Sequence, residues 1–150
     1  MNHDICNAPV SLQNQPALDS WNAMIRAFLA HKPATPQHLG AVIDAEPQFA
    51  MAHAARGIFS LMMGRAEMWQ VAEDARTTAH AARAESGANS REAGWLAALD
   101  HWLADSPTGA IAALEAVLDD TPQDTLTAKT SHAIRFILGD AQGMRDSVER

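Results

Sequence analysis

Apolar residues recur every three or four positions along most of the chain, and proline or glycine separates the stretches in which they do so. This spacing places the apolar side chains on one face of an α-helix. Proline suits the first turn of a helix, and glycine suits the position just past its end. The pattern predicts seven helices, followed by a short polar stretch over 140–150 that could form an eighth. Their expected ranges are about 16–31, 35–46, 48–63, 66–86, 90–104, 106–120 and 121–139.

Capping residues support several of these helix starts. Asn89 is followed three residues later by Glu92, which is the spacing of a capping box. Ser106 precedes a proline and is expected to cap the sixth helix. Thr35 and Thr121 also precede prolines, and we interpret both as caps in the same way. Because the links are short, consecutive helices should lie antiparallel.

Residues 1–15 differ from the rest of the chain, since they are polar, show no periodicity and include Pro9. We interpret them as a flexible N-terminal segment that precedes a helical domain over 16–150. Cys6, the only cysteine, lies in this segment. A single cysteine excludes an internal disulfide and a cysteine-based zinc site, so its thiol is interpreted as a bystander.

The composition favours the all-α class. Of the 150 residues, 47% are apolar and 5% are aromatic, and alanine accounts for about a fifth. Alanine is the best helix former and a poor strand former. A chain of this length typically buries ~70% of the surface that its unfolded form exposes, which is enough for one domain.

Charge argues against several kinds of partner. The net charge is −7 with histidines neutral, and the basic residues form no run. A phosphate backbone requires clustered positive charge, so nucleic acid is not an expected partner, and anionic membranes are disfavoured for the same reason. No apolar run approaches the ~20 residues of a membrane span, and the start lacks a signal-peptide pattern. We therefore expect a cytoplasmic protein with no membrane partner.

The chain contains an internal repeat. Residues 41–48 read AVIDAEPQ, and residues 116–123, 75 positions later, read AVLDDTPQ. The register continues through the next helix to a glycine in each copy, Gly64 and Gly139. An offset of 75 accommodates two helical hairpins of about 34 and 41 residues, a length typical of stacked helix pairs. We therefore predict an α–α superhelix, a solenoid of three to four antiparallel hairpins.

This pattern resembles the tetratricopeptide repeat, whose hairpin has a small residue midway along its first helix and alanine and large apolar residues along its second. Residues 91–122 carry the resemblance best. The matching residues are Ala98, Ala110, Leu114, Val117 and the closing Pro122.

The order of features is similar to that of the tetratricopeptide repeat protein 38 family. Residues 49–57 read FAMAHAARG and residues 132–139 read HAIRFILG, where that family has fALAHAxRG and HxxxFxLG. A long alanine-rich helix over 66–86 lies between them, as in the family. The resemblance covers about 16–139 and implies a helical-repeat fold. Members are usually much longer, and the family implies no defined reaction.

Polar side chains on the first helices of the hairpins are the candidate binding residues. In a stacked-hairpin solenoid these helices line the concave face. There they could grip a peptide carboxylate or another polar ligand. The candidates are His53, Arg56, Ser60, Asp100, His101, His132 and Arg135. The alternative is that each histidine is a packing residue or lies partly exposed.

Neither a metal motif nor a catalytic motif is evident. The sequence has no His-Glu-x-x-His, no Gly-rich phosphate loop and no Gly-x-Ser-x-Gly elbow, so we predict no catalytic residues and no cofactor. His101 and Asp105, four positions apart, could supply two metal ligands. Without a third ligand, no metal site is predicted.

Two sets of large apolar residues have both a packing and a binding interpretation. Tryptophans at helical spacing could anchor a partner, but core packing is favoured. Methionines beside a helix end could form an adaptable binding surface, but filling gaps beneath the turn is favoured. The tryptophans are Trp69, Trp95 and Trp102, and the methionines are Met62, Met63 and Met68.

These observations favour a non-enzymatic interaction module that binds a protein or peptide through the concave face of a short solenoid. We also expect a homodimer, in which the open C-terminal end of the solenoid, the helix over 125–139, packs against a second copy. The alternative is a small-molecule-binding or catalytic protein built on the histidines and Asp100, which must then converge around a pocket. A third interpretation is a structural part of a larger assembly, with no ligand of its own.

Overall fold

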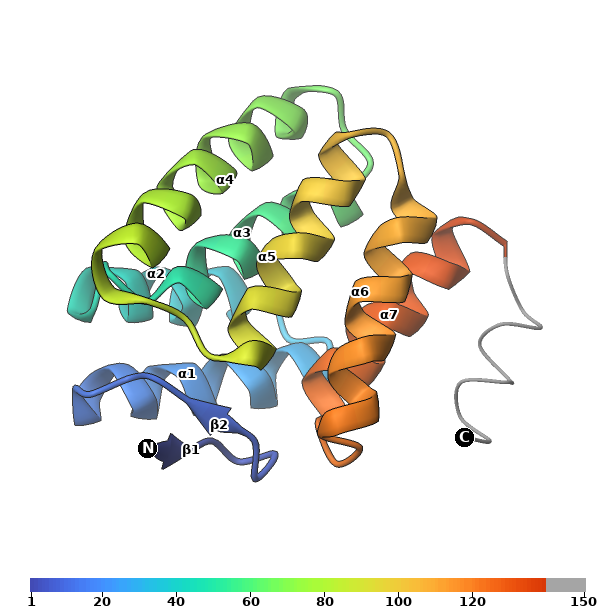
Figure 1. The fold of residues 1–150 in the computed structure, drawn as a ribbon. Helices are drawn as coiled ribbons and strands as arrows, with labels where there is room; N and C mark the ends of the chain where they lie inside the picture. The colour runs from blue at the N-terminus through green and yellow to red at the C-terminus, as the bar shows by residue number, and fades with distance from the viewer. Residues whose placement is uncertain (140–150) are drawn as a thin grey trace.

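The computed structural model describes residues 1–139, most of which lie in α-helices, so the predicted all-α class is confirmed (Figure 1). Two short strands, β1 (Asn2–His3) and β2 (Pro9–Val10), pair antiparallel. The helices are α1 (Gln15–Leu29), α2 (Thr35–Ala45), α3 (Ala50–Met62), α4 (Glu67–Ser86), α5 (Ser90–Leu103), α6 (Pro107–Asp120) and α7 (Thr125–Ile137). None of these helices is both long and apolar enough to cross a membrane. The stretch predicted over 140–150 lies outside the described residues.

Local capping contacts set the start of two helices. Asn89 and Glu92 form the predicted capping box of α5: Asn89 Oδ1 accepts the backbone N–H of Glu92 at 2.9 Å, and Glu92 Oε1 accepts that of Asn89 at 3.1 Å. At the start of α6, Ser106 Oγ accepts the backbone N–H of Gly109 at 3.2 Å. Both predicted caps are confirmed, because each depends only on residues within one helical turn.

Two other predicted helix starts are wrong by a few residues. Thr35 is the first residue of α2 rather than its cap, and its hydroxyl donates to the carbonyl of Lys32 at 2.9 Å. Helix α7 begins after Asp124 instead of Thr121, because the Asp124 carboxylate accepts the backbone N–H of Thr127 at 3.2 Å. A threonine before a proline is therefore an incomplete guide to helix starts in this chain.

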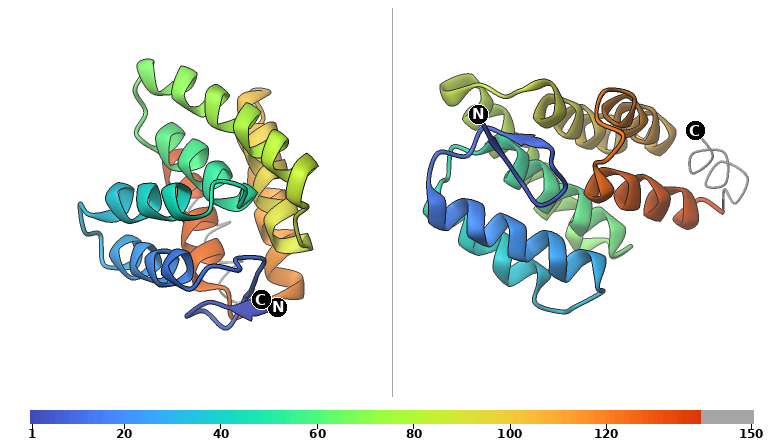
Figure 2. Two further views of the ribbon diagram at one scale, coloured as in Figure 1. Left: turned by 90° about the vertical axis from the view of Figure 1, so that its left-hand side faces the viewer. Right: turned by 90° about the horizontal axis from the view of Figure 1, so that it is seen from below.

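The helices pack as antiparallel pairs, α1 with α2, α3 with α4 and α5 with α6, and α7 then packs against α6 (Figures 1 and 2). Helix α3 is central, with contacts to α2, α4, α5 and α7. All of its residues are buried except Arg56, Phe59 and Met62. Neighbouring helices therefore cover most of the α3 surface that was expected to face an open concave groove.

The internal repeat is present in the structure as a repeated helix–turn–helix unit. The residue after the first helix, Glu46 or Thr121, has a φ of −144° or −135°. Each copy ends in a glycine with positive φ, 69° at Gly64 and 74° at Gly139, a conformation that residues with a side chain rarely adopt. The helix ends fall at matching positions in the two copies: Ala45 and Asp120, Ala50 and Thr125, and Met62 and Ile137.

Two glycines let α5 approach its neighbours closely. A Cβ on Gly57 of α3 would lie 2.6 Å from Cδ2 of Leu99 on α5. A Cβ on Gly94 of α5 would lie even closer to Cγ2 of Val117 on α6. A larger residue at either position would require side chains or helices to move. The spacing of α5 from both neighbours therefore depends on these two positions.

The N-terminal segment, interpreted above as flexible, packs against the helices (Figure 1). Ala8, Val10 and Leu12 are fully buried, and the backbone N–H of Ser11 donates to Glu92 Oε2 at 2.7 Å. These apolar residues alternate with others, as in an extended chain with one buried face. This two-residue period is too short to resemble the helical spacing of the rest of the chain.

A buried ion network joins this segment to the bundle. The guanidinium of Arg91 on α5 lies 2.9 Å from Asp4 Oδ2 and 2.7 Å from Asp124 Oδ2, and all three side chains are buried. The indole N–H of Trp21 on α1 donates to Asp4 Oδ2 at 3.0 Å. Burial alone would lower the pKa of Arg91, but the hydrogen bonds and negative charges of Asp124 and Asp4 raise it above its ordinary value.

Replacement of Gly57 by leucine should destabilise the fold, because a side chain at this position would collide with Leu99. Overpacking of this kind typically costs about 1–3 kcal/mol, and a full leucine belongs at the upper end or beyond. Urea unfolding followed by circular dichroism measures the change. Ala41→Leu, on the exposed surface of α2, is the matched control and should leave the midpoint almost unchanged. Equal midpoints for both variants would contradict the close approach of α3 and α5.

The Cys6 thiol reports whether residues 1–14 stay packed. It is buried, and desolvation raises the pKa of Cys6, which reduces the reactive thiolate. We expect Ellman's reagent to label Cys6 much more slowly in the folded chain than in urea. Asp4→Asn should accelerate labelling by weakening the Arg91 network, whereas Asp19→Asn, on the exposed side of α1, should not. Equal labelling rates with and without urea would show that the segment is not packed.

Candidate binding groove

Two of the four residues in the proposed histidine–aspartate cluster, Asp100 and His53, have different hydrogen-bond partners. Asp100 on α5 faces α4, where its Oδ1 lies 2.6 Å from Nε of Arg76 and 2.8 Å from Nε2 of His80. His53 is buried, and its Nε2 lies 2.7 Å from the carbonyl oxygen of Pro47. Both side chains therefore connect an element of the fold to its neighbour and leave no shared pocket.

The other two histidines lie elsewhere. His101 is exposed and packs beside the start of α6, since a Cβ on Gly109 would lie 2.8 Å from its Nδ1. His132 on α7 is partly buried, and its Nε2 has no hydrogen-bond partner among residues 1–139. No hydrogen bond within these residues joins any two of His53, Asp100 and His101. The convergence that a catalytic cluster requires is not found.

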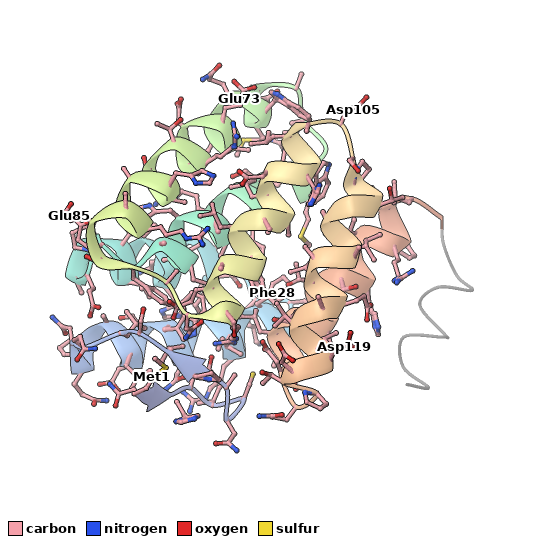
Figure 3. The ribbon with its side chains drawn as sticks, viewed as in Figure 1. Met1, Phe28, Glu73, Glu85, Asp105 and Asp119 are labelled. Carbon is pink, nitrogen blue, oxygen red and sulfur yellow. The ribbon has the colours of Figure 1, made fainter. Side chains whose placement is uncertain are left out.

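The pair considered as metal ligands, His101 and Asp105, belongs to no larger cluster of potential ligands within residues 1–139. Asp105 lies beyond the end of α5, in the turn before α6, with a φ of 63° (Figure 3). Within residues 1–139, no three His, Cys, Asp or Glu side chains are placed to hold a metal ion.

Arg135 contributes to the packing of α7 on α6. Its Nη2 lies 3.5 Å from Oε1 of Glu115, which also accepts the hydroxyl of Ser131 at 2.8 Å. Glu115 and Ser131 are buried. Arg135 is therefore part of the interface between these two helices rather than of a surface site.

Arg56 and Ser60, by contrast, line a groove on the surface, which we call the α2–α4 groove. Helices α2 and α4 both pack on α3 but make almost no contact with each other, and the groove lies between them. Its volume is about 460 Å³, within the roughly 300–1,000 Å³ of ligand pockets. Its lining residues are Pro33, Pro36, Leu39, Arg56, Phe59, Ser60, Met63, Met68 and Val71. A second hollow, between α5 and α6, has a volume of only about 100 Å³.

Aromatic packing fixes the floor of the α2–α4 groove. The ring of Phe59 stacks on Phe28 of α1 at a centroid distance of 4.7 Å and meets Trp95 of α5 edge to face at 6.2 Å. Trp95 is fully buried, which confirms its predicted role in the core. Because Phe59 of α3 packs against aromatic rings of both α1 and α5, the groove has a preformed floor.

The walls expose apolar side chains, among them Met63, for which gap filling beneath the turn was the favoured interpretation. Met63 is 54% exposed and Val71 is 39% exposed. Trp69 on α4, which is not among the residues that line the groove, is 40% exposed, and its indole N–H donates to Glu73 Oε1 at 3.0 Å. The core-packing interpretation is therefore wrong for Trp69, and the gap-filling interpretation is wrong for Met63. Met63 and Val71 line the same groove, and adjoining exposed apolar side chains are typical of an interaction surface.

Arg56 is the one charged residue among the nine that line the groove. Its Nη2 lies 4.0 Å from the position that a Cβ on Gly40 would take, so the guanidinium extends along α2. No acidic side chain within residues 1–139 forms an ion pair with it. The hydroxyl of Ser60 donates to the carbonyl of Arg56 at 2.7 Å and is thereby satisfied within α3. The groove is thus apolar with a single positive charge on one wall.

Comparisons with protein-family models, curated proteins and solved structures find no match to this chain. The α2–α4 groove is therefore the feature of the molecule that points to a function. It presents apolar surface and one guanidinium, without a nucleophile and base in hydrogen-bond contact. This arrangement can bind a ligand but offers no evident chemistry.

A neutral dye such as Nile red should bind the groove, because its fluorescence rises on contact with apolar surface. The variant Met63→Glu/Val71→Glu should reduce the signal, while its free energy of unfolding changes by no more than about 0.5 kcal/mol per site, as expected at exposed positions. Phe136→Glu is the matched control, since Phe136 is 76% exposed on α7, outside the groove. A signal lost only in the control would place the dye elsewhere.

Proposed function

We propose that this chain is a non-enzymatic interaction module that binds an apolar segment of a partner protein in the α2–α4 groove. The observation that carries the proposal is the preformed apolar groove, in whose walls the side chains of Met63 and Val71 are exposed. Methionine is flexible and polarisable, which suits a surface that adapts to a partner's side chains. Helical domains recognise partners through grooves of this kind.

A tetratricopeptide-like superhelix of three to four hairpins remains part of this proposal, as does the resemblance to the tetratricopeptide repeat protein 38 family. The antiparallel pairing of α1 to α6 and the repeated unit that ends at Gly64 and Gly139 support it. The proposed binding surface differs from the one expected. Because α3 is enclosed, the partner would bind between α2 and α4 instead of along the first helices of the hairpins.

The proposal also includes a homodimer and a cytoplasmic location. The last turn of α7 and the residue after it expose Phe136, Ile137 and Leu138, which supports a contact between copies at this end. We do not extend the catalytic alternative, since no hydrogen bond within residues 1–139 joins His53, Asp100 and His101.

Site-specific photo-crosslinking in the source cells tests both surfaces. A benzophenone amino acid at Met63 should crosslink a discrete partner protein, and the product should disappear when Val71→Glu is added. The same amino acid at Gln70, exposed on α4 but outside the groove, is the control. At Phe136 it should crosslink the chain to itself. If Met63 yields only the products seen at Gln70, the groove is not a protein-binding site.

A further inference from the structure

We propose that Arg56 makes the α2–α4 groove selective for an amphipathic helix of the partner that carries one carboxylate beside its apolar face. This inference rests on the proposed function, because it names the occupant of the same groove. Two features support this inference. One is the single positive charge of the groove, and the other is that the backbone N–H and C=O groups of its walls are already hydrogen-bonded within helices.

The charge complementarity comes from one side chain. Arg56 has no acidic partner within residues 1–139, although apolar side chains surround it in the groove. When a partner covers those side chains, water leaves and the guanidinium loses part of its solvation. An apolar partner without an acid then leaves a charge unpaired, which opposes binding. A partner with a glutamate or aspartate replaces the lost water with a charge-assisted hydrogen bond, which can be bidentate.

The net charge of the chain and the single arginine of the groove together limit how acidic the partner can be. The whole chain has a net charge of −7, which repels a strongly acidic segment over a distance. Only one positive side chain lines the groove, so one carboxylate is matched and a second is not. An isolated acidic residue within an apolar face therefore fits better than an acidic run.

The backbone of the walls favours a helix over an extended peptide. The walls are α2, α3 and α4, whose main-chain groups are paired within each helix, and Pro33 and Pro36 at one end have no N–H. An extended peptide would find few main-chain partners here, and its own N–H and C=O groups would be buried unpaired. A helix pairs its backbone internally and presents only side chains.

A peptide selection tests the inference. The probe is a displayed library of helical peptides with apolar residues at i, i+3, i+4 and i+7, and with Glu, Gln or Lys at the positions flanking the apolar face. The full chain should enrich Glu. Arg56→Gln should abolish the preference, and Arg56→Glu should reverse it towards Lys. Arg26→Glu, at an exposed arginine on α1 outside the groove, is the matched control and should keep the preference for Glu.

Affinities of selected peptides then give the size of the effect. The Glu peptide should bind the unmodified chain roughly tenfold more tightly than its Gln counterpart, as for a hydrogen bond to a charged group, and this ratio should fall to about one with Arg56→Gln. Because Arg56 is exposed, unfolding midpoints of its variants should match that of the unmodified chain.

The outcomes separate this inference from the proposed function. If peptides are enriched but Glu is not preferred, or if the preference survives in Arg56→Gln, the role of Arg56 is overturned and the groove remains a binding site. If no peptide is enriched on the unmodified chain, the proposed function fails as well. Stabilisation by dodecanoate without peptide enrichment would assign the groove to a small amphiphile and overturn both.

Discussion

The buried guanidinium of Arg91 holds together parts of the chain that helix pairing alone would leave apart. It pairs with Asp4 of the N-terminal segment and with Asp124 at the start of α7, and Trp21 of α1 donates to the same Asp4 carboxylate. A buried charge is tolerated only when it is fully paired, and loss of one partner typically costs about 3–5 kcal/mol. The packing of α1, α5 and α7 around the N-terminal segment therefore depends on this one network, and loss of any member should destabilise all four elements together.

This enclosure decides where a binding surface can form. With residues 1–14 packed at one end of the bundle and α7 in contact with α1 and α3, little of the expected concave face remains open. Polar residues on that face become structural, as His53 and Arg135 do. The remaining apolar hollow lies between α2 and α4 on the surface of α3. Arg56 and Ser60 of α3 are among the residues that line it.

Features that depend on neighbouring residues were the most predictable from the sequence. The capping box at Asn89 and the repeat that ends at Gly64 and Gly139 act within a turn or two of helix, so their residue patterns suffice. The N-terminal segment was missed because its anchor, Asp4, finds its partner far away on α5, and only a short alternation of apolar residues marks it.

The candidate site was predictable only in part. Arg56 and Ser60 were identified from their place on the third predicted helix, whereas most of the groove was not, because it depends on the angle between α2 and α4. The sequence places Asp100 on the expected helix but does not indicate that it faces Arg76 and His80 on α4. Periodicity predicts which side chains share one face of a helix. Which other helix that face contacts depends on the packing of the whole chain, and the sequence pattern does not show it.

The repeat also distinguishes the two exposed apolar surfaces of the molecule. Phe136 occupies the position in the second copy that Leu61 occupies in the first, yet Phe136 is 76% exposed and Leu61 is 9% exposed. In the first copy α4 packs along α3, and within residues 1–139 no helix follows α7 in the same way. The exposed end of α7 is therefore one side of a helix pair whose other side residues 1–139 do not supply. The α2–α4 groove, in contrast, is formed by three helices of the chain itself.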